Sequence, residues 1–187
     1  MKETIIEAAK VLKAGGVILY PTDTVWGLGC DASESEAIKR IFAIKKRLAD
    51  KSLVLLAADL DMVARYVREI PEMAVQLIEV NDAPMTIIYP ESMYIAPEAV
   101  ASDGSVGIRI PLNDDCVDLC RKVGRPIVST SANFSGEPAP KKFADIPDEI
   151  KAAVDYIVDP ELEKNSTGKA SQVIKVGLDG RIQIIRA

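Results

Sequence analysis

Apolar positions along this chain alternate between helical spacing and short continuous runs. From residue 3 to residue 14 they recur every three or four positions, which predicts a helix that Gly15 and Gly16 end. The same spacing predicts further helices at residues 34–48, 60–68, 72–80 and 114–123. Short apolar runs predict strands at residues 17–20, 53–58, 85–89, 105–110, 127–130, 171–176 and 181–186.

The order of these elements indicates an α/β fold. Strands alternate with helices, and the last two strands flank Asp179-Gly180, a strong signal for a hairpin turn. A parallel core with an added hairpin is typical of a mixed sheet. The chain of 187 residues has no repeat or long linker, so we predict one domain over residues 1–187. The order of the strands does not follow from this pattern.

One position in the second predicted helix breaks its apolar stripe. Ile38, Ile41 and Phe42 define the stripe, and its next position is Lys45. A lysine on a buried face must reach a partner, extend outward or line a cavity. Arg47 lies about 160° further round an ideal helix, so we expect the helix to end near it.

Cations gather around this helix end. Six cations and one anion lie between residues 39 and 51, and they are Lys39, Arg40, Lys45, Lys46, Arg47, Lys51 and Asp50. Such a cluster suits a polyphosphate. A solvated basic helix end, favourable to the helix dipole, is the alternative.

Two predicted strands run directly into polar residues. After Pro21, the turn presents Thr22, Asp23 and Thr24. The strand that begins at Ile127 leads into Ser129, Thr130, Ser131, Asn133 and Ser135. Ligands of open α/β sheets bind beyond the carboxyl ends of strands, and hydroxyls and backbone amides there hold carboxylates or phosphates. The sequence thus predicts an anion site, with ordinary polar turns as the alternative.

Three further features have open interpretations. Trp26 either walls a pocket or belongs to the core. Arg109 lies on the opposite face of its strand from Ile108 and Ile110, so it faces either solvent or a site. The polar segment 160–170 is either a mobile cover over a site or a surface loop. Neither a Walker motif nor a GxGxxG fingerprint is present, so any ATP site has another kind of cradle.

The amino-acid composition limits the kinds of reaction that the chain can catalyse. The chain has no histidine, which excludes histidine-dependent triads and two-histidine zinc motifs. Reactions on phosphates fit this limit because they depend mostly on positioning and charge stabilisation. The three cysteines, Cys30, Cys116 and Cys120, do not form a disulfide framework. Cys116 and Cys120 share a helix face, which favours a core pair over a metal or redox role.

Charge and hydropathy indicate the compartment. The net charge of −5 argues against a protein that coats nucleic acid. No apolar run approaches the roughly 20 residues of a membrane span. The N-terminal pattern contains acidic residues and reads as a helix, not as a signal peptide. We therefore expect a cytoplasmic protein without membrane contact.

Four segments together resemble the threonylcarbamoyl-AMP synthase family, in its short bacterial form related to YrdC and Sua5. They are residues 21–29, the Lys45-x-Arg47 pair, residues 106–111 and residues 129–136. The resemblance spans nearly the whole chain. It implies a twisted mixed β-sheet with flanking helices around an open, positively charged groove.

The resemblance also implies a reaction. The family joins L-threonine, bicarbonate or CO2, and ATP to give threonylcarbamoyl-AMP and pyrophosphate, with Mg²⁺ expected on the phosphates. A separate transferase complex then modifies an adenosine of tRNA. The resemblance thus implies an L-threonylcarbamoyladenylate synthase, a nucleotidyltransferase that acts in tRNA processing.

Site roles follow from the resemblance, residue by residue. It implies that Lys45 and Arg47 hold the ATP phosphates and stabilise charge as pyrophosphate leaves. On the nucleotide side it places Ser129, Ser131, Asn133 and Arg186. On the threonine side it places Thr22, Thr24, Trp26, Arg109 and Ser171.

Three other functions stay open at this point. A paralogue with the same groove would act on another nucleotide or carbamoyl substrate. A non-catalytic RNA-binding module would use the basic groove, although the acidic net charge and the 5% aromatic content count against it. No heptad repeat or long exposed apolar helix supports a purely structural role.

Overall fold

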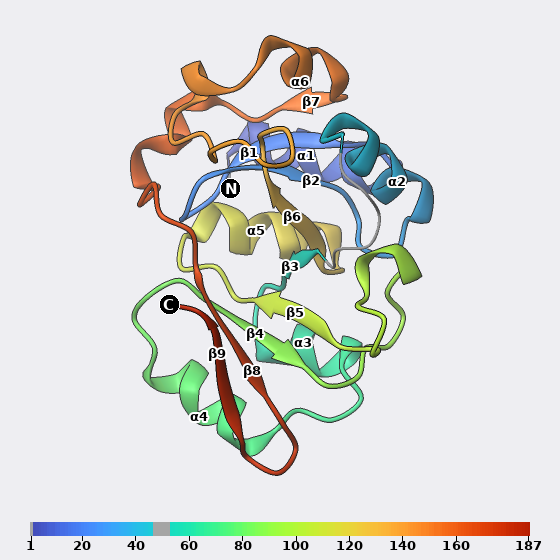
Figure 1. Ribbon diagram of the computed structural model, residues 1–187. Coiled ribbons are helices and arrows are strands. Elements are labelled where there is room, and N and C mark those ends of the chain that lie inside the picture. Colours follow the sequence, from blue (N-terminus) through green and yellow to red (C-terminus); the bar gives the residue numbers. More distant parts are fainter. Residues whose placement is uncertain (1, 47–52) are drawn as a thin grey trace.

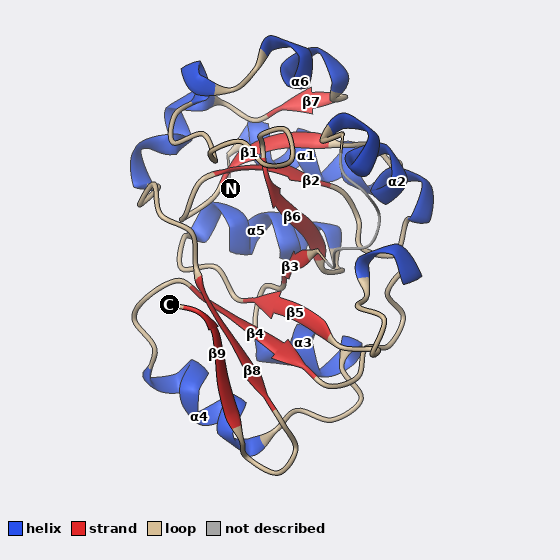
Figure 2. Cartoon of the chain, in the orientation of Figure 1, coloured by secondary structure: helices blue, strands red, loops and turns tan. Residues whose placement is uncertain are grey.

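The computed structural model describes residues 2–46 and 53–187. Within them a single mixed sheet of nine strands extends from β7 at the top of Figure 1 to β9 at the bottom. Helices lie beside the strands along the length of the sheet (Figure 2). The predicted α/β class with a mixed sheet is confirmed.

The first five α-helices lie where the apolar spacing of the sequence predicts helices, and the sixth was not predicted. The α-helices are α1 (Glu3–Lys13), α2 (Ser35–Ile44), α3 (Leu60–Tyr66), α4 (Glu72–Val80), α5 (Asp114–Val123) and α6 (Asp148–Ala153). Short 3-10 helices are η1 (Pro97–Ala99), η2 (Phe143–Asp145) and η3 (Pro160–Asn165). Asn113 caps α5 by accepting a hydrogen bond from the backbone N–H of Cys116, and Gly124 ends it with a positive φ of 80°.

The strands are shorter than the helices and mostly follow the apolar runs. They are β1 (Ile18–Pro21), β2 (Trp26–Gly29), β3 (Val54–Leu56), β4 (Met85–Tyr89), β5 (Val106–Arg109), β6 (Ile127–Ser131), β7 (Tyr156–Ile157), β8 (Gln172–Val176) and β9 (Ile182–Arg186). Their order in the sheet is β7-β1-β2-β6-β3-β5-β4-β8-β9. Three pairs are parallel: β1 with β7, β3 with β5, and β4 with β8.

Register places a continuous apolar row across the middle of the sheet. Val128 pairs with Leu55, Leu55 with Ile108, Ile108 with Ile87, and Ile87 with Ile174. All five side chains are buried. Residues paired across strands share a face of the sheet, so this row forms one wall of the core.

The opposite face of the sheet has a different composition, in rows that contain small and polar residues beside Leu56 and Ile88. Gly27 pairs with Ser131, Val54 with both Ser129 and Gly107, and Arg109 with Thr86. Small and polar side chains leave room above the sheet where large apolar ones would fill it. The alternation of the strands thus gives an apolar row on one face and leaves a hollow over part of the other face, where Leu56 and Ile127 still belong to the core.

Two predictions about elements need correction. The helix predicted at 34–48 ends at Ile44 in the described residues, with Lys45 as its C-cap. The segment after Pro21 is not only a turn, because it continues into β2, which no apolar run predicted. Two glycines in β2 lower its intrinsic preference for a strand. Its backbone pairing with β1 and β6 stabilises the strand instead.

None of the helices in the described part of the chain has the length and apolar composition that a membrane span requires.

Candidate anion-binding site

A cavity of about 370 Å³ lies over the small and polar residues on this face of the sheet. Seven residues that the sequence proposed for the site line it together: Thr22, Thr24, Arg109, Ser129, Ser131, Ser171 and Arg186. They come from the β1–β2 turn, β5, β6 and the region of β8 and β9. Its volume lies within the range of about 300–1,000 Å³ typical of small-molecule sites.

The β1–β2 turn is held by the Thr22 hydroxyl. The backbone N–H groups of Thr24 and Val25 donate to Thr22 Oγ1 at 3.0 and 3.2 Å. Thr22 Oγ1 also lies 2.8 Å from the carbonyl oxygen of Val25 and from Thr24 Oγ1. Thr22 therefore shapes the turn, and Thr24 lies between it and Arg109.

Arg109 faces the cavity and not solvent. Its side chain is 3% exposed and forms an ion pair with Asp23, whose side chain is 6% exposed. A second guanidinium nitrogen lies 3.4 Å from Thr24 Oγ1. The other carboxylate oxygen of Asp23 accepts from the backbone N–H of Leu112 at 3.0 Å. Asp23 is thus fully engaged and fixes the guanidinium at the cavity wall.

Lys45 is buried, as the apolar stripe predicted, with 3% of its surface exposed. Its ammonium donates to the carbonyl oxygens of Ser131 and Asn133, the latter at 2.8 Å. The backbone N–H of Ser135 in turn donates to the Lys45 carbonyl at 2.9 Å. These bonds tie the end of α2 to the turn after β6, next to the cavity but not in its lining.

Asn133 also acts within this turn. Its side-chain amide donates to the carbonyl oxygens of Phe134 and Glu137 at 3.1 and 2.6 Å. Its side chain is thereby engaged in local hydrogen bonds, and it does not line the cavity described above.

Three of the cations gathered around α2 form ion pairs with carboxylates, and the interpretation of the cluster as a polyphosphate site stays a prediction. Lys39 pairs with Glu36 at 2.8 Å, Arg40 with Asp155, and Lys46 with Glu149 at 3.2 Å. Each of these charges is matched by a carboxylate. Arg47 and Lys51 lie outside the described residues.

Arg186 closes the C-terminal side of the cavity. Its Nε and one terminal nitrogen donate to the Ser171 carbonyl at 3.0 and 2.8 Å. The Ser171 hydroxyl lies 2.8 Å from the Thr86 hydroxyl, so β4 fixes this corner. Thr86 and its role were not predicted, because nothing local distinguishes it from other strand threonines.

Trp26 lies in the core, which is one of the two interpretations left open by the sequence, and it does not line this cavity. Its place on the threonine side stays a prediction. Its side chain is 0% exposed and packs on Phe143 with ring centroids 5.1 Å apart. Its indole N–H donates to Glu163 at 2.6 Å. Sequence reasoning missed Glu163, because its partner lies 137 positions earlier in the chain.

The segment 160–170 lies against the site. The backbone N–H groups of Thr167 and Gly168 donate to the carbonyl oxygens of Asp23 and Thr24 at 2.9 and 2.7 Å. The Ser166 hydroxyl donates to the Thr22 carbonyl. The segment therefore braces the β1–β2 turn, and it is neither a separate surface loop nor remote from the cavity.

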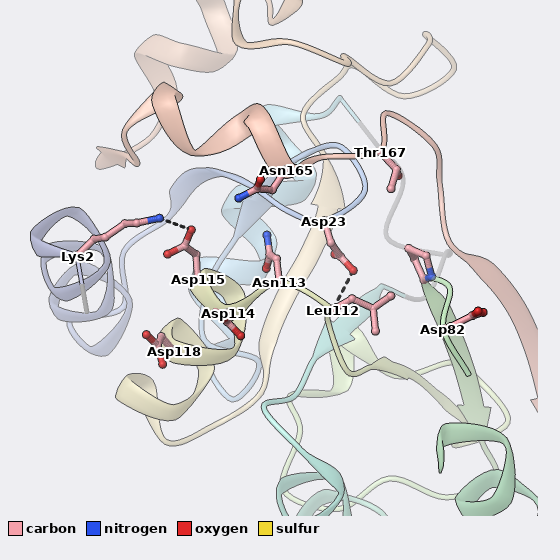
Figure 3. A pocket seen from close by; sticks show the side chains of 11 residues that line it. Lys2, Asp23, Asp82, Leu112, Asn113, Asp114, Asp115, Asp118, Asn165 and Thr167 are labelled. Atoms are coloured by element: carbon pink, nitrogen blue, oxygen red, sulfur yellow. Dashed lines mark hydrogen bonds and ion pairs between the residues drawn. The ribbon is translucent and has the colours of Figure 1, made fainter. Parts of the chain in front are cut away.

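A second, larger cavity of about 760 Å³ has the opposite charge (Figure 3). Asp82, Asp114, Asp115 and Asp118 line it, and its cation, Lys2, pairs with Asp115 at 2.7 Å. Such a lining repels phosphates and carboxylates. In the described residues, no group of three or more histidine, cysteine or acidic side chains is arranged to hold a metal ion.

The thiols lie inside the core. Cys116 and Cys120 are buried, with their sulfurs 3.7 and 3.6 Å from the carbonyl oxygens of Pro21 and Leu56. Burial, followed by the negative charge of Asp23, raises the pKa of Cys116 to about 12. The predicted core pair is confirmed.

Comparison with known proteins places this arrangement in a family. A family model named for Sua5, YciO and YrdC, and described as telomere recombination, matches residues 10–187. The chain is 35% identical to a threonylcarbamoyl-AMP synthase of Stenotrophomonas maltophilia (strain K279a), over 86% of this chain and 89% of that protein. It is 36% identical to a threonylcarbamoyl-AMP synthase of Xanthomonas campestris pv. campestris (strain B100), over 83% and 84%.

A solved structure is also similar. The crystal structure of P. abyssi Sua5 complexed with L-threonine superposes with a TM-score of 0.82 and 29% sequence identity. The match covers 92% of this chain and 50% of that one, so this chain spans half the length of that protein.

Proposed function

Because the chain belongs to the Sua5/YciO/YrdC family, we propose that it is an L-threonylcarbamoyladenylate synthase. The reaction joins L-threonine, bicarbonate or CO2, and ATP. The threonine nitrogen bonds to the carbon of CO2, which bicarbonate yields by taking up a proton and losing water, and releases a proton to solvent to give a carbamate. A carbamate oxygen then bonds to the α-phosphorus, the bond from that phosphorus to the bridging oxygen breaks, and pyrophosphate leaves with that oxygen. The observation that carries the proposal is the cavity where hydroxyls of β6 face Arg109 and Arg186.

The nucleotide side of the site is assigned to β6 and its surroundings. Ser129 and Ser131 donate to phosphate oxygens, and Arg186 supplies charge from the opposite wall. Lys45 and Arg47 stabilise the negative charge that grows on the departing pyrophosphate. In this assignment Asn133 and Lys45 also fix the turn after β6, which their hydrogen bonds support.

The threonine side is assigned to the β1–β2 turn. Thr24 and Arg109 contact the amino acid or its carbamate, while Thr22 orients Thr24. Ser171 closes this side through Thr86. A fixed guanidinium suits a carboxylate, because its planar donors match two oxygens.

Mg²⁺ belongs to this proposal as part of the ATP substrate. No carboxylate belongs to the lining of the 370 Å³ cavity in the described residues. Mg²⁺ keeps several waters and binds substrate phosphates readily, so hydroxyls and phosphate oxygens suffice to hold it.

The product has a downstream use in the same proposal. A separate transferase complex carries the threonylcarbamoyl group to a tRNA adenosine, and the chain works in the cytoplasm beside it. Direct RNA binding by this chain is a distinct alternative. A steep salt dependence of RNA affinity, without ATP turnover, would favour that alternative.

The test is pyrophosphate release from ATP and bicarbonate, with and without L-threonine. Release that requires L-threonine and is much weaker with L-serine is the expected result. Equal release with either amino acid would move the function to a paralogue with another substrate. No release despite ATP binding would contradict the synthase assignment.

A further inference from the structure

Tyr20 lies in β1, which β2 separates from β6, and its side chain extends across β2 toward the residues that line the cavity. The side chain is 1% exposed, and its residue pairs with Gly27 of β2. A Cβ atom added at Gly27 or Gly29 would lie 3.4 or 2.7 Å from Cε1 of the Tyr20 ring. The two glycines of β2 therefore leave the space in which the ring crosses this strand toward β6.

The ring crosses toward Ser129. The same Cβ position at Gly27 lies 3.5 Å from Ser129 Oγ, so the ring and the Ser129 hydroxyl both lie against this glycine. Burial, and after it the thiol of Cys116, raise the pKa of Tyr20 well above its usual value, and the neighbouring Ser129 hydroxyl opposes this shift. Ser129 and Gly27 both line the cavity.

The Tyr20 hydroxyl is an exception among buried polar groups. Within the described residues, it is a buried side-chain oxygen without a hydrogen bond of normal geometry. Buried polar groups are nearly always paired, and leaving one unpaired destabilises the folded protein. A phenylalanine would fill the same space without that cost, so the hydroxyl needs an explanation other than packing.

We propose that Tyr20 is a positioning residue that orients the Ser129 hydroxyl toward the nucleotide. The inference rests on the proposed nucleotide site. A serine hydroxyl has one proton and two acceptor positions. In the structure without nucleotide the Tyr20 hydroxyl makes no such bond. When the nucleotide binds, the Tyr20 hydroxyl donates to Ser129 Oγ, and the serine proton is left to point into the cavity, where it meets a phosphate oxygen. Donation into Ser129 also strengthens its own donation, because hydrogen bonds in a chain polarise one another.

The test is a double-mutant cycle on ATP affinity, measured by calorimetry with MgATP. Tyr20→Phe keeps the ring and removes the hydroxyl, and Ser129→Ala removes its partner. We expect each single variant to bind ATP about 3- to 10-fold more weakly, the size of one lost hydrogen bond. Because Tyr20 acts through Ser129, the double variant should be no weaker than Ser129→Ala alone.

Thermal stability and a matched tyrosine separate this role from a structural one. Without ATP, Tyr20→Phe should unfold at the same temperature as the parent protein or higher, since the buried hydroxyl that it removes is unpaired in that state. Tyr89 on β4 is equally buried, but it pairs with Val106, which does not line the cavity, whereas Tyr20 pairs with Gly27, which does. Tyr89→Phe should therefore leave ATP affinity unchanged within about twofold. Unchanged ATP affinity in Tyr20→Phe, or effects that multiply in the double variant, would overturn the inference.

The outcomes distinguish this inference from the proposed function. If the parent protein binds ATP but releases no pyrophosphate with L-threonine, the proposed synthase function is wrong. The role of Tyr20 is then still decided by the double-mutant cycle on ATP affinity. A fully active parent with an unaffected Tyr20→Phe variant contradicts only the role of Tyr20. A parent that binds neither ATP nor pyrophosphate overturns both.

Discussion

Two cavities meet at the Asp23–Arg109 ion pair, and they differ in volume and in charge. The cavity of about 760 Å³ contains Asp23 and a group of further aspartates. The cavity of about 370 Å³ contains Arg109, Arg186 and a row of hydroxyls. The smaller one suits an anionic nucleotide, so the chemistry of the wall identifies the site better than its volume does.

The difference originates in how each wall is built. The first turn of α5 brings Asp114 and Asp115, acidic residues that stabilise a helix N-terminus by interacting with its dipole. This is an ordinary structural use of carboxylates. In the smaller cavity, by contrast, Arg109 is buried, and several strand residues of the wall are small or polar. These residues fill the space less well than large apolar side chains would, and the fold gains no stability from them.

The largest expected effect comes from breaking the ion pair between the cavities. Arg109→Met leaves the buried Asp23 carboxylate without its charge partner, and we expect a loss of about 3–5 kcal/mol in the free energy of unfolding. Urea unfolding measures it. Arg121, whose ion pair with Asp59 is exposed, provides the control, and Arg121→Met should change stability by less than about 0.5 kcal/mol. A variant as stable as the parent would show that the pair does not hold the two walls together.

Next in size is the loss of charge stabilisation beside the smaller cavity. Lys45→Ala or Arg47→Ala should lower the rate of threonine-dependent pyrophosphate release by about 10²–10³-fold. The control is Lys46→Ala, which removes an exposed lysine paired with Glu149 and should stay within about twofold of the parent rate. Parent-like turnover in Lys45→Ala or in Arg47→Ala would remove that residue from the assignment.

A smaller effect is expected at the C-terminal wall. Arg186→Ala should weaken ATP binding about tenfold, because a charge-assisted hydrogen bond to the nucleotide is lost. Arg181 lies in the same hairpin but is exposed, with its side chain 90% accessible. Calorimetry should find parent-like affinity for Arg181→Ala; equal losses in both variants would point to a general charge effect instead of a contact.

The smallest effect is expected in the acidic cavity. Asp118→Asn should change ATP affinity by less than about twofold, and any change should be a gain, since a weakly screened negative charge is removed. The same titration by calorimetry measures it. A loss of tenfold or more would locate the nucleotide in the larger cavity and reverse the comparison.

The sequence predicted the elements of this fold better than it predicted their arrangement. The helix at residues 114–123 and the strand at 85–89 follow from local periodicity, and both have the predicted bounds. The strand order does not follow from local pattern, because contacts such as that of β2 with β6 join distant segments. The strand β2 was missed for the same reason, since two glycines hide it and its neighbours stabilise it.

Only some residues of the candidate site could be predicted from the sequence. Lys45 was marked by its place on an apolar stripe, and its burial confirms that inference. The ion pairs of Lys39 with Glu98 and of Arg40 with Asp155 were not predicted, because these two carboxylates come from remote segments. Glu163 and Tyr20 carry no local signal, since only the folded chain brings them to Trp26 and Ser129.

The most direct test of this account is a crystal structure of the chain with ATP and L-threonine bound. We predict nucleotide density in the 370 Å³ cavity, with phosphate oxygens near Ser129, Ser131 and Arg186. Nucleotide density among Asp82, Asp114 and Asp118 in the 760 Å³ cavity would contradict the central claim that wall chemistry, and not volume, marks the site.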